Sequence, residues 1–294
     1  MYKLIAIDLD GTLLNSYGAI SIKNKETIKK VEETGTEIVI ASGRPIDSIK
    51  TIANEIDSKN YFIAGNGAIV YDMKKDEIIY EKCMSKQKVL EIIKICEDNS
   101  IGYSVYTEKE IITTALKYNV LYYHKENLKK AEEKKSKITI VNNMIEYIEN
   151  KENCNFLKIT VCDEDKSVFN AIIRKMRNVK DVEVLDVSHM ARKVIKQGTE
   201  EVPVEYYYTE VSRSNVDKWN AIKFLAELLN IKQEEIMAIG DNINDKKMIE
   251  NAGLGVAMGQ STPVITSIAN EVTSSNNEDG VAEILQKYYK NINF

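Results

Sequence analysis

Four short apolar segments, each followed by a polar or glycine-rich segment, constrain the fold of this chain most strongly. They are "YKLIAI" before "DLDGT", "EIVIA" before "SGRP", "YFIA" before "GNGA" and "EIMAIG" before "DNIND". Apolar runs of this length are typical of strands buried on both faces of a sheet. Between the first two runs, Ile22, Ile28 and Val31 recur at helical spacing, and Gly35 is placed to end the helix. This order predicts an α/β fold with a doubly wound, Rossmann-like parallel sheet.

The middle of the chain, from residue 83 to residue 208, has a different pattern. Amphipathic segments such as "SKQKVLEIIKICEDN" and "EDKSVFNAIIRKMRNV" alternate with the strand-like segments "GYSVYT", "KITIV", "FLKITVC" and "VEVLDVS". This mixture predicts a separate α+β domain. After it, a periodic helix begins near Asn215 or Asp217, and "GLGVAMG" returns to the buried-strand pattern. We therefore expect a core domain of residues 1–82 and 209–294, interrupted by an inserted domain of residues 83–208.

Size, charge and cysteine content narrow the possible partners. The 294 residues suffice for two domains. The net charge is -5, with lysines interspersed among glutamates, which argues against a nucleic-acid partner. No apolar run approaches the roughly 20 residues of a membrane helix, and no leader pattern begins the chain, so we expect a cytoplasmic protein without a membrane partner. The four cysteines form no CxxC pair, which argues against a zinc or redox site.

The polar clusters that follow the strands are expected to share one site, because ligands of open α/β sheets bind beyond the carboxyl ends of the strands. The candidate residues are Asp8, Asp10, Ser42, Arg44, Lys218, Asp241, Asn244 and Asp245. Asp8, Asp241 and Asp245 would form a negative, oxygen-rich pocket. Such a pocket suits a hard divalent cation such as Mg²⁺, which allows the carboxylates to lie together.

The remaining candidates favour phosphate chemistry. Ser42 precedes Pro45 in a segment typical of a helix start, where backbone N–H groups and the helix dipole attract an anion. Lys218 adds a point charge. A metal, an anion site and a spare carboxylate indicate phosphoryl transfer, with Asp8 as a nucleophile that forms an aspartyl-phosphate. Asp10, two residues later, could then act as general acid and afterwards as general base.

The quoted motifs together resemble a known family. "DLDGTLL", "ASGRP", the lysine of "VDKWNAI" and "GDNIND" stand in the order of the four motifs of the haloacid dehalogenase-like hydrolases. The arrangement is similar to the Cof-type sugar-phosphatase group, as are "GNGAIVYD", the late "SSNNEDGVAEIL" and the insertion, which resembles the group's large α/β cap. The resemblance spans almost the whole chain. It implies a catalytic core domain and a cap domain that selects substrates.

The resemblance also implies a role for each matching residue. Asp8 would be the nucleophile and Asp10 the acid/base. Mg²⁺ would be held by Asp8, by Asp241 and by the backbone carbonyl of Asp10, with Asp245 orienting water on the metal. The phosphate-binding residues would be Ser42, Gly43, Lys218 and Asn244, and the residues near the substrate would be Arg44 and Asn66.

Two positions depart from the family pattern, and three residues have structural alternatives. The family has glycine directly after the third-motif lysine, whereas Trp219 follows Lys218; a helix tolerates the ring, which could narrow the site or contact the cap. Asn215 replaces an earlier glycine and can also adopt a left-handed turn. Taken alone, Ser42 is compatible with a helix cap, and Arg44 and Lys218 with solvated charges.

The function that these residues favour is a Mg²⁺-dependent phosphatase acting on small phosphate monoesters, such as sugar phosphates or similar metabolites. A phosphotransferase or phosphomutase on the same scaffold is an alternative, in which the phosphoryl group passes to a sugar hydroxyl. A protein that binds a phosphorylated ligand without cleaving it is another. A receiver-type switch is disfavoured, because about 120 residues suffice for it and Asp10 favours turnover. The sequence leaves both a monomer and a homodimer open.

Overall fold

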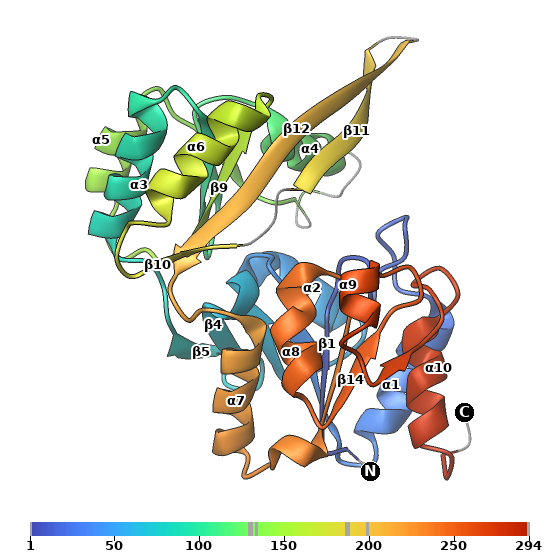
Figure 1. The fold of residues 1–294 in the computed structure, drawn as a ribbon. Coiled ribbons are helices and arrows are strands. Elements are labelled where there is room, and N and C mark those ends of the chain that lie inside the picture. The colour runs from blue at the N-terminus through green and yellow to red at the C-terminus, as the bar shows by residue number, and fades with distance from the viewer. Residues whose placement is uncertain (1, 129–131, 133–134, 186–188, 198–199, 293–294) are drawn as a thin grey trace. The chain divides into compact units, whose positions relative to one another are not determined.

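The computed structural model describes residues 2–128, 132, 135–185, 189–197 and 200–292, and it divides into two compact units (Figure 1). The first unit comprises Met1–Lys82 and Val216–Phe294, and the second comprises Cys83–Asn215. Within the described residues, none of the helices combines the length and the apolar character that crossing a membrane requires.

The first unit is built on a twisted sheet with the strand order β15-β14-β13-β1-β2-β3-β4-β5. Neighbouring strands from β15 to β3 are parallel, while β4 and β5 extend the sheet antiparallel. The strands are β1 (Leu4–Ile7), β2 (Glu37–Ala41), β3 (Tyr61–Ala64), β4 (Ile69–Asp72), β5 (Glu77–Glu81), β13 (Ile236–Gly240), β14 (Leu254–Ala257) and β15 (Glu271–Val272). All residues of β1, β13 and β14 are buried, so this central part of the sheet is covered on both faces.

Helices cover the two faces of this sheet (Figure 1). They are α1 (Ile22–Glu32), α2 (Ile46–Glu55), α7 (Lys218–Leu228), α8 (Lys246–Asn251), α9 (Pro263–Thr266) and α10 (Gly280–Tyr288). Leu4 and Ala6 of β1 pack in one apolar cluster with Ile222 of α7 and Met248 of α8. Each large apolar side chain buried in this way contributes about 1.5–3 kcal/mol to folding.

Local signals in the sequence account for the helix ends. Ser21 caps the N-terminus of α1 by accepting a hydrogen bond from the Asn24 N–H group. Asp217, one of the two predicted caps, accepts from the Asn220 N–H group at 2.7 Å and begins α7. Asn215, the other candidate, has a φ of 56° and makes the left-handed turn that precedes the helix.

The second unit is a largely antiparallel sheet covered by helices. The strand order is β10-β12-β9-β6-β7-β8, and β11 pairs with β12. The strands are β6 (Gly102–Thr107), β7 (Ile111–Thr113), β8 (Ile138–Ile140), β9 (Phe156–Asp163), β10 (Val182–Val184), β11 (His189–Gln197) and β12 (Glu200–Arg213), and the helices are α3 (Lys86–Asp98), α4 (Tyr118–Asn127), α5 (Met144–Glu149) and α6 (Lys166–Met176). Side chains of α3, α5 and α6 form one apolar core with β6 and β9.

The predicted fold class, a parallel-sheet α/β core with an inserted α+β domain, is confirmed. The predicted end of the insertion needs correction. Tyr208 lies inside β12, where it pairs with Cys162 of β9, and β12 continues to pair as far as Arg213. Because β12 pairs within the second sheet up to Arg213, the second unit ends at Asn215 rather than at residue 208.

Candidate active site

The carboxyl ends of neighbouring parallel strands place four candidate residues at one edge of the first sheet. Asp8 directly follows β1, Ser42 follows β2 and Asp241 follows β13. Asn66 lies in the turn Gly65–Gly67, which follows β3. Since these strands are adjacent and parallel, their following residues converge.

Lys218 joins two of the predicted carboxylates in a buried cluster. Its Nζ atom donates to Asp8 Oδ1 at 2.5 Å and to Asp245 Oδ1 at 2.6 Å. The Lys218 side chain is fully buried, so the alternative of a solvated helix residue is wrong. Burial by itself lowers the pKa of Lys218, but the charges of Asp245 and Asp8 outweigh it and raise that pKa above its usual value. The ammonium group therefore stays charged inside the protein.

The carboxylates of this cluster carry more negative charge than Lys218 neutralises. Burial raises the pKa of Asp8 well above its usual value, and the charge of Asp245 raises it further. Burial and Asp245 likewise raise the pKa of Asp241 to about 7. Ligand oxygens of Asp8, Asp241 and Asp245 lie within 4.8 Å of one another. Such closely spaced carboxylate oxygens, with charge left uncompensated, fit a hard divalent cation such as Mg²⁺.

Asp245 is held in place through both of its oxygens. Oδ1 accepts from Lys218, while Oδ2 accepts from the backbone N–H groups of Asp241 at 3.1 Å and Asn242 at 3.0 Å. Gly240 makes room for it, because a Cβ atom there would lie 2.5 Å from the Asp245 Cβ atom. Asp245 therefore fixes Lys218 and the loop after β13 relative to each other.

Gly11 and Thr12 bring the loop after β1 against Asp241. Gly11 has a φ of +88°, and a Cβ atom there would lie 2.4 Å from Asp241 Oδ2, so a larger residue would displace the carboxylate. Thr12 Oγ1 donates to Asp241 Oδ1 at 3.2 Å. This contact positions one of the candidate metal ligands.

Asp10 is bound by Arg44. Arg44 Nε donates to Asp10 Oδ2 at 2.8 Å and Nη2 donates to Oδ1 at 2.5 Å, which is a bidentate ion pair. Arg44 Nη1 also donates to Ser48 Oγ at 3.3 Å. The alternative of a solvated surface charge is thus wrong for Arg44, whose side chain is only 20% exposed.

The predicted phosphate-side residues form a second group. Asn66 has a φ of 57°, and its N–H group donates to the Ser42 carbonyl at 3.0 Å. Asn244 Nδ2 donates to Asn66 Oδ1 at 3.2 Å. A Cβ atom at Gly43 would lie 2.8 Å from the same oxygen, so a larger residue there would displace the Asn66 side chain.

Ser42 does not begin a helix, contrary to our expectation. Helix α2 begins at Ile46, with Pro45 as its extended N-cap residue. The Ser42 hydroxyl instead accepts a hydrogen bond from the Arg44 N–H group at 3.2 Å, in a local turn that competes with helix formation. Ser42 is buried and lies outside α2.

Trp219 packs into the apolar core. The side chain is 7% exposed and belongs to the cluster that contains Leu4 and Ala6 of β1. On a helix, consecutive side chains point about 100° apart, so Trp219 faces the core while Lys218 faces the carboxylates. The departure from the family pattern leaves the lysine contacts in place.

Sequence reasoning missed Gln260, which follows β14. Its side chain donates from Nε2 to the Gly11 carbonyl at 2.5 Å and accepts the Asn276 N–H group at 3.1 Å. The rule that polar residues after parallel strands gather at one edge would have identified it, since Gln260 closely follows the buried segment "LGVAM".

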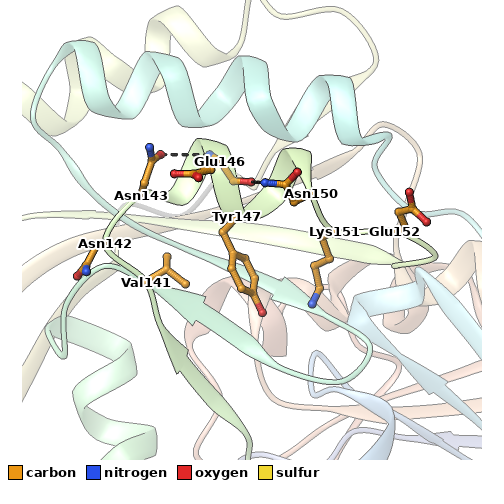
Figure 2. Close-up of a pocket in the computed structure, with 8 residues that line it drawn as sticks. All are labelled: Val141, Asn142, Asn143, Glu146, Tyr147, Asn150, Lys151 and Glu152. Atoms are coloured by element: carbon orange, nitrogen blue, oxygen red, sulfur yellow. Dashed lines mark hydrogen bonds between the residues drawn. The ribbon is translucent and has the colours of Figure 1, made fainter.

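A pocket of about 660 Å³ lies in the second unit, around α5 (Figure 2). Figure 2 shows the side chains of Tyr147 and Lys151 extending to the same side of this helix. Lys151 Nζ donates to Glu110 at 2.5 Å and lies 5.1 Å from the Tyr147 ring centroid. Lys151 is therefore paired with a carboxylate of the protein itself, which argues against a role in binding an anionic ligand.

Comparison with known proteins identifies the family. The model of the haloacid dehalogenase-like hydrolase family matches residues 5–285. The phosphatase YwpJ of Bacillus subtilis is 30% identical, with 97% of this chain and 99% of YwpJ covered. A second Bacillus subtilis protein, the 5-amino-6-(5-phospho-D-ribitylamino)uracil phosphatase YcsE, is 27% identical, with 97% and 95% covered. A solved haloacid dehalogenase-like hydrolase from B. subtilis matches with a TM-score of 0.79 at 29% identity, over 97% of this chain and 99% of that chain.

The chain belongs to the haloacid dehalogenase-like hydrolase family. It is an enzyme of the phosphatase type, which is the activity named for both curated relatives. The predicted family, its Cof-type group and the enzyme class are thereby confirmed.

Proposed function

We propose that the protein is a Mg²⁺-dependent phosphatase that hydrolyses small phosphate monoesters through an aspartyl-phosphate on Asp8. The observation that carries this proposal is the buried cluster in which Lys218 joins Asp8 and Asp245 beside Asp241. It combines a carboxylate nucleophile, a fixed cation and oxygen ligands for a metal, which are the parts that phosphoryl transfer requires.

In the first step, a carboxylate oxygen of Asp8 attacks the phosphorus atom, and the bond from phosphorus to the leaving oxygen breaks. Asp10 gives its proton to that oxygen, so the alcohol leaves neutral. Arg44 binds both oxygens of the Asp10 carboxyl group, so Asp10 has to leave this ion pair before it donates a proton. Lys218 holds Asp8 in place and faces the transferring phosphoryl oxygens with its charge.

In the second step, water attacks the phosphorus atom of the aspartyl-phosphate. Asp10 takes a proton from this water, and the bond between phosphorus and the Asp8 oxygen breaks to release inorganic phosphate. Asp10 is suited to this part, because it lies two residues after Asp8 in the same loop. Ser42, Gly43 and Asn244, with Asn66 nearby, would bind the phosphoryl oxygens.

Asp8, Asp241 and the Asp10 carbonyl would hold Mg²⁺, with Asp245 beside them. When bound, the ion would supply positive charge against the charge that develops on the transferring phosphoryl group. The close carboxylate oxygens and the raised pKa values of Asp8 and Asp241 support this assignment.

We assign substrate selection to the second unit, as a cap inserted into the catalytic core. The assignment rests on its position in the chain, between residues that supply the second and the third motif. Sugar phosphates and similar phosphorylated metabolites are the proposed substrates, and the compound named for YcsE belongs in any panel of candidates.

The test is phosphate release from a panel of phosphorylated metabolites and para-nitrophenyl phosphate, with Mg²⁺ or with a chelator. We expect release that requires Mg²⁺ and differs widely between metabolites. Transfer of the phosphoryl group to an added sugar in place of water would indicate a phosphotransferase. If no compound is hydrolysed while some still raise the melting temperature, the phosphatase proposal is overturned.

A further inference from the structure

The segment "SSNNEDG" has no part in the reaction steps above, although it resembles a family motif. In the structure, Asn276 and Asn277 of this segment contact the loop of residues 8–16, which carries Asp8 and Asp10 and is called the nucleophile loop below. Asn276 Nδ2 donates to the Leu14 carbonyl at 2.8 Å. The N–H group and the hydroxyl of Ser16 each donate to Asn277 Oδ1 at 3.0 Å. Two asparagine side chains thus hold the end of the loop.

Gln260 holds the middle of the same loop. Its Oε1 atom accepts from the Asn276 N–H group at 3.1 Å, which leaves the amide nitrogen to donate to the Gly11 carbonyl at 2.5 Å. Both ends of one amide group are therefore engaged, and its orientation is defined by the two partners. Gly11 directly follows Asp10 and also lies against Asp241. The hydrogen bond from Gln260 to its carbonyl therefore holds the nucleophile loop between the residues after β13 and those after β14.

The segment that supplies Asn276 is itself braced. The Ser275 hydroxyl donates to Glu278 Oε2 at 2.7 Å, and the Gly280 N–H group donates to the Ser275 carbonyl at 3.1 Å. The Ser274 carbonyl accepts from the Gly259 N–H group at 3.2 Å, next to Gln260 in the chain. A rigid support of this kind is what precise placement of a reactive loop requires.

Building on the proposed function, we infer that Gln260 and Asn276 are positioning residues that hold the nucleophile loop in its reactive geometry. They act through the Gly11 and Leu14 carbonyls, which accept their side-chain hydrogen bonds. Loss of these contacts would loosen Asp8 and Asp10 relative to Lys218 and Asp241. Because small misplacements of reacting groups slow the chemical step, kcat should fall while substrate binding changes little.

The experiment compares Gln260→Met and Asn276→Leu, which keep the side-chain shape but remove the hydrogen bonds. Gln233→Met is the matched control, because Gln233 Nε2 also donates to a backbone carbonyl, that of Asn251 at 2.7 Å, near the opposite end of β13. With para-nitrophenyl phosphate and Mg²⁺, we expect kcat to fall about tenfold in both variants and KM to stay within about twofold. The control should match the wild type.

Hydrogen exchange supplies a readout that does not depend on activity. The amides of Thr12, Leu13 and Leu14 donate to carbonyls inside the nucleophile loop. We expect them to exchange at least about tenfold faster in Gln260→Met and Asn276→Leu than in the control. Unchanged exchange in both variants would overturn the inference, whether or not kcat fell. If the wild-type protein released no phosphate, the proposed function would fail, while the exchange comparison would still decide this inference.

Discussion

Both units contain buried carboxylates beside lysines, yet their charge balance is opposite. In the first unit, Lys218 faces Asp8, Asp245 and Asp241, and negative charge is in excess. In the second unit, Glu110 accepts from Lys151 at 2.5 Å and lies 3.4 Å from Lys137, so positive charge surrounds a single carboxylate.

The pKa values of the carboxyl groups differ between the two clusters in the way that this charge balance predicts. Burial and neighbouring carboxylates raise the pKa of Asp241 to about 7. Burial also raises the pKa of Glu110, but the hydrogen bonds from Lys151 and Thr139 and the charges of both lysines outweigh it and lower that pKa to about 2. A compensated cluster stabilises the fold, whereas an uncompensated one costs stability and persists where chemistry needs it. The comparison thus separates the proposed reactive site from a structural cluster.

The largest expected effect is on activity. Asp8→Asn keeps the shape but removes the nucleophilic charge, so we expect phosphate release to fall by at least about a thousandfold. The matched change in the other cluster, Glu110→Gln, should leave kcat within about twofold. Phosphate release by the two purified variants checks this. A similar loss of activity in both variants would show that the two clusters do not differ in their role in catalysis.

Replacing the lysine of each cluster should lower the free energy of unfolding by different amounts. Lys218→Met leaves Asp8 and Asp245 without their buried cation, and we expect a loss of about 3–5 kcal/mol in the free energy of unfolding. Lys151→Met leaves Glu110 with Lys137 and Thr139, and we expect about 1–2 kcal/mol. Urea unfolding with a chelator measures both. Equal losses of unfolding free energy would show that the two clusters have the same charge balance.

The dependence of stability on pH should have opposite signs in the two units. The folded-state pKa of Glu110 is about 2 against an ordinary 4.5, so its stabilisation is present above pH 4.5 and is lost as the pH falls toward 2. Asp241 has a raised pKa of about 7, so without metal its contribution to stability falls as the pH rises from about 4 to 7.

At about 1.4 kcal/mol per pKa unit, the expected effect is roughly 3 kcal/mol for Glu110 and roughly 4 kcal/mol for Asp241. Melting curves of the chelated protein at several pH values, with Glu110→Gln and Asp241→Asn, measure them. Each substitution should remove its own part of the profile and leave the other. A profile that neither substitution changes would contradict both assignments.

Much of the core was predictable from the sequence, because short apolar runs ending in polar residues specify parallel strands. The same pattern placed Asp8, Ser42 and Asp241 at one edge of the sheet. The end of the insertion was not predictable, because β12 continues from the tyrosine-rich segment to Arg213 without a turn signal.

Individual contacts of side chains in the site could not be predicted from the sequence either. Nothing in the motif order indicates that Arg44 pairs with Asp10, because the pair depends on the turn in which Ser42 accepts the Arg44 N–H group. The Gln260 contact depends on the loop after β14 meeting Gly11, which is 249 residues away in the chain. The sequence pattern can place Gln260 at this edge of the sheet, but it does not indicate which group Gln260 binds, because that depends on how the loops pack.

Asp8 is the proposed acceptor of the phosphoryl group, and trapping the phosphorylated Asp8 tests this role most directly. Asp10→Ala should accumulate it from para-nitrophenyl phosphate with Mg²⁺, because this leaving group departs without a proton while hydrolysis lacks its base. After rapid acid quenching and digestion, we predict that the peptide containing Asp8 gains the mass of one phosphoryl group. The additional change Asp8→Asn should abolish the gain. Turnover without this adduct, or an adduct that persists in the double variant, would contradict the account.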